Sequence, residues 1–231
     1  MIRYLTRLSA ICFVLVGFAT SNEARADLVL DQVIVDLEVG KPLRDDIEIT
    51  NAGDERMFVL VEPFEILNPG LDTQVRTPLD SPSKSRVLVS PTRAILEPGQ
   101  RRLIRIAALG ERPESDRIFR VRIRPVVGDV ISNEDALKVL VGYDTLVLLR
   151  ASEVKGEIES ERRDEILTLT NRSNTAFELF EGRQCDDRNG SCEELPAKRL
   201  YPSQEMKIPL KYGTPVTYKV AVGSKVFERT Y

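Results

Sequence analysis

Few side chains of this 231-residue chain could do catalytic chemistry, because the sequence contains no histidine. Neither a Ser-His-Asp nor a Cys-His arrangement can be built, and no glycine-rich phosphate loop of known spacing occurs. Acidic residues do occur in adjacent pairs, at Asp45-Asp46, Asp186-Asp187 and Glu193-Glu194. Neighbours on a strand point to opposite faces, so such pairs do not form an acid–base couple. We assign no catalytic residue and expect that the protein is not an enzyme.

The cysteines predict a cross-link. Cys12 lies in a segment that we expect to be removed, which leaves Cys185 and Cys192, separated by a turn-rich loop. In an exported chain such a pair meets an oxidising compartment, so a Cys185–Cys192 disulfide is predicted. The alternative is a pair of metal ligands, but no histidine or third mature cysteine completes a tetrahedral site. We therefore expect no metal and no other cofactor.

The first 26 residues have the pattern of a cleavable secretory signal. Arg3 and Arg7 precede an apolar stretch from about Leu8 to Ala19, and Ala24-Arg25-Ala26 closes the segment. The alternative is a membrane anchor, but the uncharged run is shorter than the roughly 20 residues that a spanning helix needs. The mature chain is predicted to begin at Asp27, outside the cytoplasm, without membrane insertion.

Without this segment the chain carries more acidic than basic residues. Proteins that bind nucleic acid or an anionic membrane surface usually carry an excess of positive charge. This chain has no such excess, so neither partner is expected. The remaining length exceeds one simple sandwich domain and suits two domains of about 100 residues each.

The elements that must position these residues are short alternating runs, which indicate β-strands. A first set covers residues 28–37, 47–50, 57–66, 86–90, 101–109, 117–126 and 136–150. A second set covers residues 165–171, 176–182, 206–210, 216–222 and 225–231, after a connector at 151–156. The pattern predicts an all-β fold of two sandwich domains, at 27–151 and 152–231.

Two runs stand out within the first set. In 117–126, Phe119, Val121 and Ile123 share one face, and the other face carries Arg120, Arg122 and Arg124. This arginine ladder is either a solvated face that discourages edge aggregation or a surface for an acidic or backbone-rich partner. The run 136–150 is unusually apolar. It is either a core strand or an edge strand that can complete another protein's sheet.

These segments together resemble the periplasmic chaperones of the chaperone-usher pathway, the PapD-like family. The resemblance rests on SPTRAILEPGQRRLIRI (90–106), on RIFRVRIRPV (117–126) and on the apolar strand that ends at Arg150. The segment QCDDRNGSCEELPAKRLYPSQEMKIPL (184–210) is similar to the second domain of the alternate, or alpha-fimbrial, branch.

The family resemblance implies two immunoglobulin-like domains in a boomerang arrangement. It implies a chaperone that binds, folds and caps fimbrial subunits by donor-strand complementation and delivers them to an outer-membrane usher. Leu137, Val139 and Val141 match the donor residues. Asp116 and Arg150 match an interdomain salt bridge. The third member of that network falls on Lys211, which has the wrong sign.

The family's two basic anchors for the subunit's terminal carboxylate fall here near Ile34 or Val35 and on Leu146, none of them basic. A carboxylate buried without donors is costly, so another polar group must replace the bases. The hydroxyl of Thr145 and backbone amides at the cleft are the candidates.

Two other functions fit an exported all-β chain. A fimbrial subunit or adhesin should show a free N-terminal donor arm and an incomplete domain, whereas this sequence supplies a full first set of strands. A carboxylate-dependent hydrolase on a β-sandwich fits least, because paired catalytic acids are missing.

Overall fold

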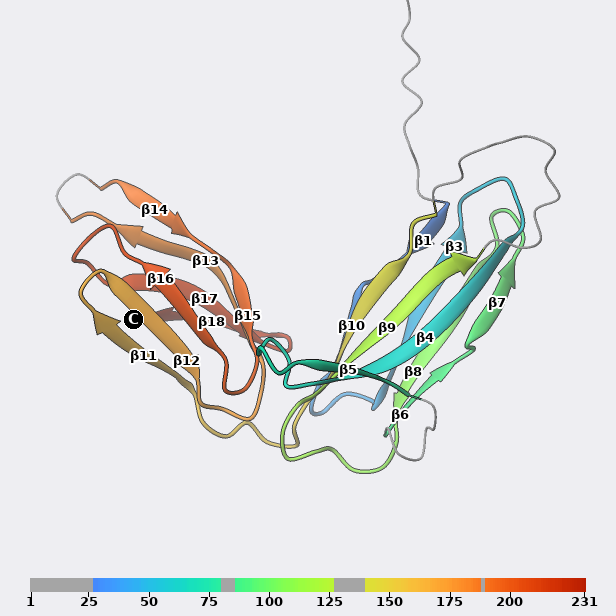
Figure 1. The fold of residues 1–231 in the computed structure, drawn as a ribbon, viewed down its shortest axis with the longest axis horizontal. Coiled ribbons are helices and arrows are strands. Elements are labelled where there is room, and N and C mark those ends of the chain that lie inside the picture. The colour runs from blue at the N-terminus through green and yellow to red at the C-terminus, as the bar shows by residue number, and fades with distance from the viewer. Residues whose placement is uncertain (1–26, 80–85, 127–139, 188–189) are drawn as a thin grey trace, which may run out of the picture.

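The structure, a computed structural model, describes residues 27–79, 86–126, 140–187 and 190–231. In these ranges all regular structure is β, in strands β1 to β18. No helix able to cross a membrane was found among them. The strands form two separate sandwiches, and Figure 1 shows these as two arms that meet at an angle. The predicted domain boundary at residue 151 lies in the connection between β10 and β11.

The first sandwich packs a four-stranded sheet on a six-stranded one. The four-stranded sheet has the order β1 (Leu28–Leu30), β3 (Arg44–Asn51), β8 (Arg101–Ala108) and β6 (Val87–Ser90). The six-stranded sheet has the order β2 (Ile34–Leu37), β10 (Tyr143–Leu149), β9 (Arg117–Val126), β4 (Met57–Leu67) and β5 (Val75–Pro78), with β7 (Arg93–Leu96) also paired to β4. The β2–β10 pairing is parallel.

Alternation along the strands builds the core of this sandwich. Phe119, Val121 and Ile123 of β9 are fully buried, as the sequence predicts, and pack in one cluster with Ile104 and Ile106 of β8. Because successive side chains of a strand point to opposite faces, the arginine ladder lies on the outer face of the six-stranded sheet.

The second sandwich is smaller. One sheet has the order β11 (Ile158–Arg163), β12 (Ile166–Asn171) and β16 (Glu205–Pro209). The other has the order β14 (Cys192–Leu195), β13 (Phe177–Cys185), β17 (Val216–Val222) and β18 (Lys225–Thr230), with β15 (Lys198–Leu200) paired to β13. At the bulge in β13, Gly182 lies on the ring of Tyr218. A Cβ atom there would come within 2.2 Å of the ring, so the position needs glycine.

Two predicted strands differ from the structure. The run 28–37 is split into β1 and β2, which belong to different sheets. Asp31 makes the transition possible by exchanging hydrogen bonds with Glu48, since its N–H donates to the Glu48 carbonyl and its carboxylate accepts from the Glu48 N–H. In the predicted run 136–150, residues 136–139 lie outside the described part of the chain, and β10 begins at Tyr143.

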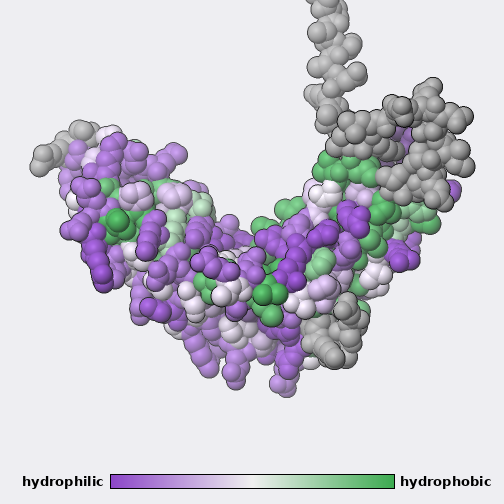
Figure 2. Space-filling view, in the orientation of Figure 1, coloured by the Kyte–Doolittle hydropathy of each residue, from purple (hydrophilic) through white to green (hydrophobic). Residues whose placement is uncertain are grey.

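Figure 2 shows a largely hydrophilic surface on both arms, interrupted by hydrophobic patches. Scattered apolar side chains are normal on a soluble surface, so the patches matter where they coincide with open strand edges.

Candidate functional site

The junction between the two sandwiches is organised around Arg150, which directly follows β10 and is 6% exposed. Its guanidinium binds both carboxylate oxygens of Asp36, at 2.8 and 2.6 Å. A third donor, Nη1, lies 3.0 Å from Oδ2 of Asp116 and 2.7 Å from the carbonyl of Ala176 in the second sandwich. Burial alone would lower the pKa of Arg150, but its bonds to Asp36 and Asp116 outweigh this effect and raise it.

Asp116 links the two sandwiches through its carboxylate. Besides Arg150, it accepts hydrogen bonds from the backbone of Ala151 and Ala176 and from the Thr175 hydroxyl, each at 2.8 Å. The predicted Asp116–Arg150 ion pair is therefore present. Its carboxylate also holds residues 175 and 176 of the second sandwich, which is the kind of fully bonded charge that a buried site requires.

Lys211, which matches the third member of the family's network by position but has the wrong sign, lies outside this network. Lys211 is exposed and pairs with Glu193 at 2.7 Å. The third member is Asp36 on β2, brought to Arg150 by the parallel β2–β10 pairing, in which Asp36 lies opposite Leu148. Strand periodicity does not specify which distant strands pair, so this acid had no signal in the sequence.

Two further contacts fix the angle between the arms. Gln204 of the second sandwich donates to the carbonyl of Gly70 at 2.9 Å. On the other side, Ser224, in the β17–β18 turn, donates its N–H and hydroxyl to Glu38, at 3.0 and 2.8 Å. Burial would raise the pKa of Glu38, but the hydrogen bonds from Lys41 and Ser224 outweigh this and lower it to about 2.

The outer face of the six-stranded sheet changes character along its length. Near the junction it is apolar: Ile66, Ile118, Leu146 and Leu148 are buried and pack with Tyr201 of the second sandwich. Farther from the junction it is lined by arginines from β5 and β9. In the described part of the chain, their carboxylate partners on this face are Glu62 and Asp144.

The positions that lack the family's basic anchors do lie together. Ile34 and Leu146 are opposite each other in the parallel β2–β10 pair. Ile34 is exposed, Val35 points into the core, and Leu146 is buried. Apolar side chains therefore occupy this part of the face.

Thr145 does not fit the predicted anchoring role. Its side chain is fully buried, and its hydroxyl donates to the carbonyl of Val121 at 2.9 Å. Thr145, Val147 and Leu149 share the inward face of β10, because residues two apart point the same way. This hydroxyl is turned away from the outer face, so a ligand there cannot reach it.

The three matched donor residues lie just before β10. Leu137 and Val139 fall outside the described residues. Val141 is 47% exposed and lies two residues before the start of β10.

β10 itself has an open edge. β2 pairs with residues 146–149 of β10. Among the described residues, Tyr143–Thr145 are therefore paired with β9 on one side and with no strand on the other. Leu146 donates its N–H away from β9, to the carbonyl of Val33 at 2.9 Å. Backbone groups two residues apart on a strand point to the same side, so those of Asp144 face the open edge.

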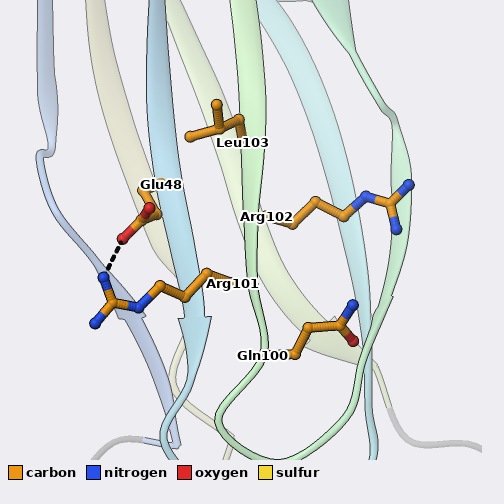
Figure 3. Close-up of a pocket in the computed structure, with 5 residues that line it drawn as sticks. All are labelled: Glu48, Gln100, Arg101, Arg102 and Leu103. Carbon is orange, nitrogen blue, oxygen red and sulfur yellow. Dashed lines mark hydrogen bonds and ion pairs between the residues drawn. The ribbon is translucent and has the colours of Figure 1, made fainter.

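A pocket on the opposite, four-stranded sheet is lined by Glu48, Gln100, Arg101, Arg102 and Leu103 (Figure 3). Glu48 and Arg101 form an ion pair across it at 3.1 Å. The side chains of Arg102 and Gln100 extend to the other side of the strand (Figure 3). The charged groups of this pocket are solvent-exposed, as is typical of a sheet surface. The residues that line it form no catalytic arrangement.

The predicted disulfide is confirmed: Cys185 and Cys192 are bonded, at the end of β13 and the start of β14. No cluster of three potential metal ligands was found in the described part of the chain.

No protein-family model and no curated protein sequence matches the chain. Solved structures do match. The class 5 fimbriae chaperone CfaA is 18% identical, with a TM-score of 0.67, over 88% of this chain and 98% of CfaA. The chain has the two-sandwich fold of the fimbrial chaperones.

Two structures of complexes contain chains of the same fold. One is a chaperone–tip adhesin complex of CFA/I fimbriae, matched at 16% identity and a TM-score of 0.64 over 89% of this chain and 98% of that one. The other is a complex of the Salmonella enterica SafA pilin with the SafB chaperone, matched at 14% identity and a TM-score of 0.59 over 90% and 98%.

Proposed function

We propose that the mature chain, residues 27–231, is a periplasmic chaperone that binds fimbrial subunits and catalyses no reaction. The support is the shared fold over nearly the whole length of several fimbrial chaperones, together with the open edge of β10. In this proposal residues 1–26 are a signal removed after export, 27–151 bind the subunit and 152–231 form the second domain.

The open edge of β10 carries the proposal. An edge with unpaired backbone groups can add a strand from another chain, and alternate side chains then fill the partner's groove. Leu137, Val139 and Val141 are the proposed donor residues. The half-exposed Val141 at the entrance to β10 is the member whose exposure the structure describes. The subunit bound in this way would be delivered to an outer-membrane usher, as in the alpha-fimbrial branch.

Co-purification from periplasm tests the proposal. The full chain is expressed with each candidate fimbrial subunit, and a chaperone should be recovered with one of them at equal stoichiometry. A subunit or adhesin would instead assemble with copies of itself or with other subunits. Recovery of the chain alone with every candidate would contradict the proposal.

A further inference from the structure

Among the residues that the structure describes, the arginines on the outer face of β9 and β5 outnumber the carboxylates that they contact. Arg124 lies 2.9 Å from Glu62, and Arg76 holds Asp144 with two bonds, at 2.6 and 3.1 Å. Within the described ranges, these two pairs occupy the acids of this face, Glu62 and Asp144. Arg122 is 3.9 Å from the Glu62 carboxylate already bound by Arg124, and it lies over the ring of Phe64 at 5.1 Å.

Arg120 has no carboxylate partner among the described residues. Its Nη1 donates to the backbone carbonyl of Asp144 at 3.1 Å. That carbonyl faces the open edge of β10, because the Leu146 N–H, two residues farther along the strand, points away from β9 to the Val33 carbonyl. The guanidinium of Arg120 thus crosses over β10 and lies beside the place where an added strand would run.

A pocket of about 440 Å³ continues from this point toward the start of β10. It is lined by Arg122, Arg124, Pro125, Leu140, Gly142, Tyr143 and Asp144. Arg124 packs directly on Gly142, since a Cβ atom at position 142 would come within 2.8 Å of the Cβ of Arg124.

We propose that Arg120 and Arg122 form a binding site for a carboxylate of the chain that is added at the open edge of β10. This inference rests on the proposed function, because the added strand brings the anion within reach. Guanidinium groups match a carboxylate with two parallel hydrogen bonds, and among the described residues neither arginine holds a carboxylate in that way. The carboxylate can belong to an acidic side chain or to a C-terminus, which the experiment separates.

Matched synthetic peptides test the site with the mature chain, residues 27–231. The probe is a fluorescent strand-forming peptide of alternating valine and threonine with one central aspartate. Its relatives carry asparagine instead of aspartate, or a C-terminal amide instead of the free acid. We expect the wild type to bind the fully acidic peptide about three to ten times more tightly than the form lacking the relevant carboxylate. If replacing the aspartate with asparagine lowers the affinity, the site binds an acidic side chain. If amidation of the C-terminus lowers the affinity, the site binds the terminal carboxylate.

Substitution identifies the arginines. Arg120→Gln with Arg122→Gln should remove this preference while binding of the uncharged peptide changes less than about twofold. Arg102→Gln, an exposed arginine of the opposite sheet (Figure 3), is the matched control and should keep the preference. If the wild type binds charged and uncharged peptides equally, or if the double variant keeps the preference, the carboxylate site is wrong. If no peptide binds at all, strand addition fails, and the proposed function fails with the site.

Discussion

Arg150 and Asp36 lie 2.6 Å apart, Nη2 to Oδ2, although 114 residues separate them in the sequence. The pair exists because β2 runs parallel to β10 and ends beside it. Arg150 also binds Asp116 and the Ala176 carbonyl, so one cation joins β2 and the residues that flank β9 and β10, all of the six-stranded sheet, to the second sandwich.

Removing this cation should be costly. Arg150→Ala leaves the fully buried Asp116 and the mostly buried Asp36 without their counter-charge, so we expect a loss of about 3 to 5 kcal/mol in the free energy of unfolding. Urea denaturation of the mature chain measures it. Arg56→Ala, which breaks the exposed pair with Glu97, is the control and should cost no more than about 0.5 kcal/mol. Equal effects of both variants would contradict a buried network.

The proposed donor residues should carry subunit capture. Val139→Asp and Val141→Asp each place a charge where an apolar side chain should enter the subunit's groove, so the complex should be lost. Periplasmic co-purification gives the result. Because Val141 is half-exposed, Val141→Asp should leave the chain as stable as the wild type within about 0.5 kcal/mol.

Val226→Asp provides the matched control for these variants, since Val226 is 56% exposed on β18 of the second sandwich. It should bind subunits normally. If Val139→Asp unfolds the protein as badly as it blocks binding, residues 136–141 belong to the core and the edge-strand assignment is wrong.

Thr145→Val separates stability from binding. The change keeps the β-branched shape and removes the hydrogen that the Val121 carbonyl accepts, so a loss of about 1 to 2 kcal/mol in unfolding free energy is expected. Subunit affinity should stay within about twofold, because the hydroxyl points into the core. A tenfold loss of affinity at unchanged stability would show that the hydroxyl does reach the ligand.

The contact between Glu38 and Ser224 predicts a pH dependence. The folded-state pKa of Glu38, about 2, lies below its ordinary value of 4.5, so the stabilisation is complete above pH 4.5 and is lost as the pH falls toward 2. The wild type should therefore be more stable than Glu38→Gln at neutral pH, and the difference should shrink across this window. Thermal unfolding between pH 7 and pH 2 provides the measurement, and a constant difference would refute the assignment.

The disulfide should contribute modestly. It joins residues only 7 apart in the sequence, so it restricts the unfolded chain little, and its removal should cost at most about 2 to 3 kcal/mol. Denaturation of the Cys185→Ala, Cys192→Ala double variant measures this cost. Peptide mass analysis of periplasmic protein, with and without reductant, should show the bond, and two free thiols would exclude it.

Local patterns were sufficient for much of the fold. The alternation of Phe119, Val121 and Ile123 with the arginine ladder predicts both faces of β9, and the exported cysteine pair predicts the disulfide. The break between β1 and β2 was not predicted, because residues 28–37 are largely apolar and indicate one strand. It falls at the polar pair Asp31-Gln32, where Asp31 exchanges hydrogen bonds with Glu48, a residue distant in the sequence.

The candidate site could be predicted less well than the fold, because its contacts also join segments that are distant in the sequence. Asp36 and Arg120 make their contacts with strands that are distant in the sequence. The inward orientation of Thr145 depends on the register of β10 against β9. Periodicity determines which residues share a face, but it does not determine which face meets a partner.

The parallel pairing of β2 with β10 also constrains when the first sandwich can form. In the proposed function the chain is exported with its N-terminus first, so residues 34–37 would reach the periplasm long before residues 146–149, their partners. Contacts between such distant segments form slowly, because a long loop must close before they are made. Until Arg150 arrives, Asp36 has no counter-charge, and β1 and β2 have no complete sandwich to join. The unfinished first domain is therefore itself a chain with open strand edges during export.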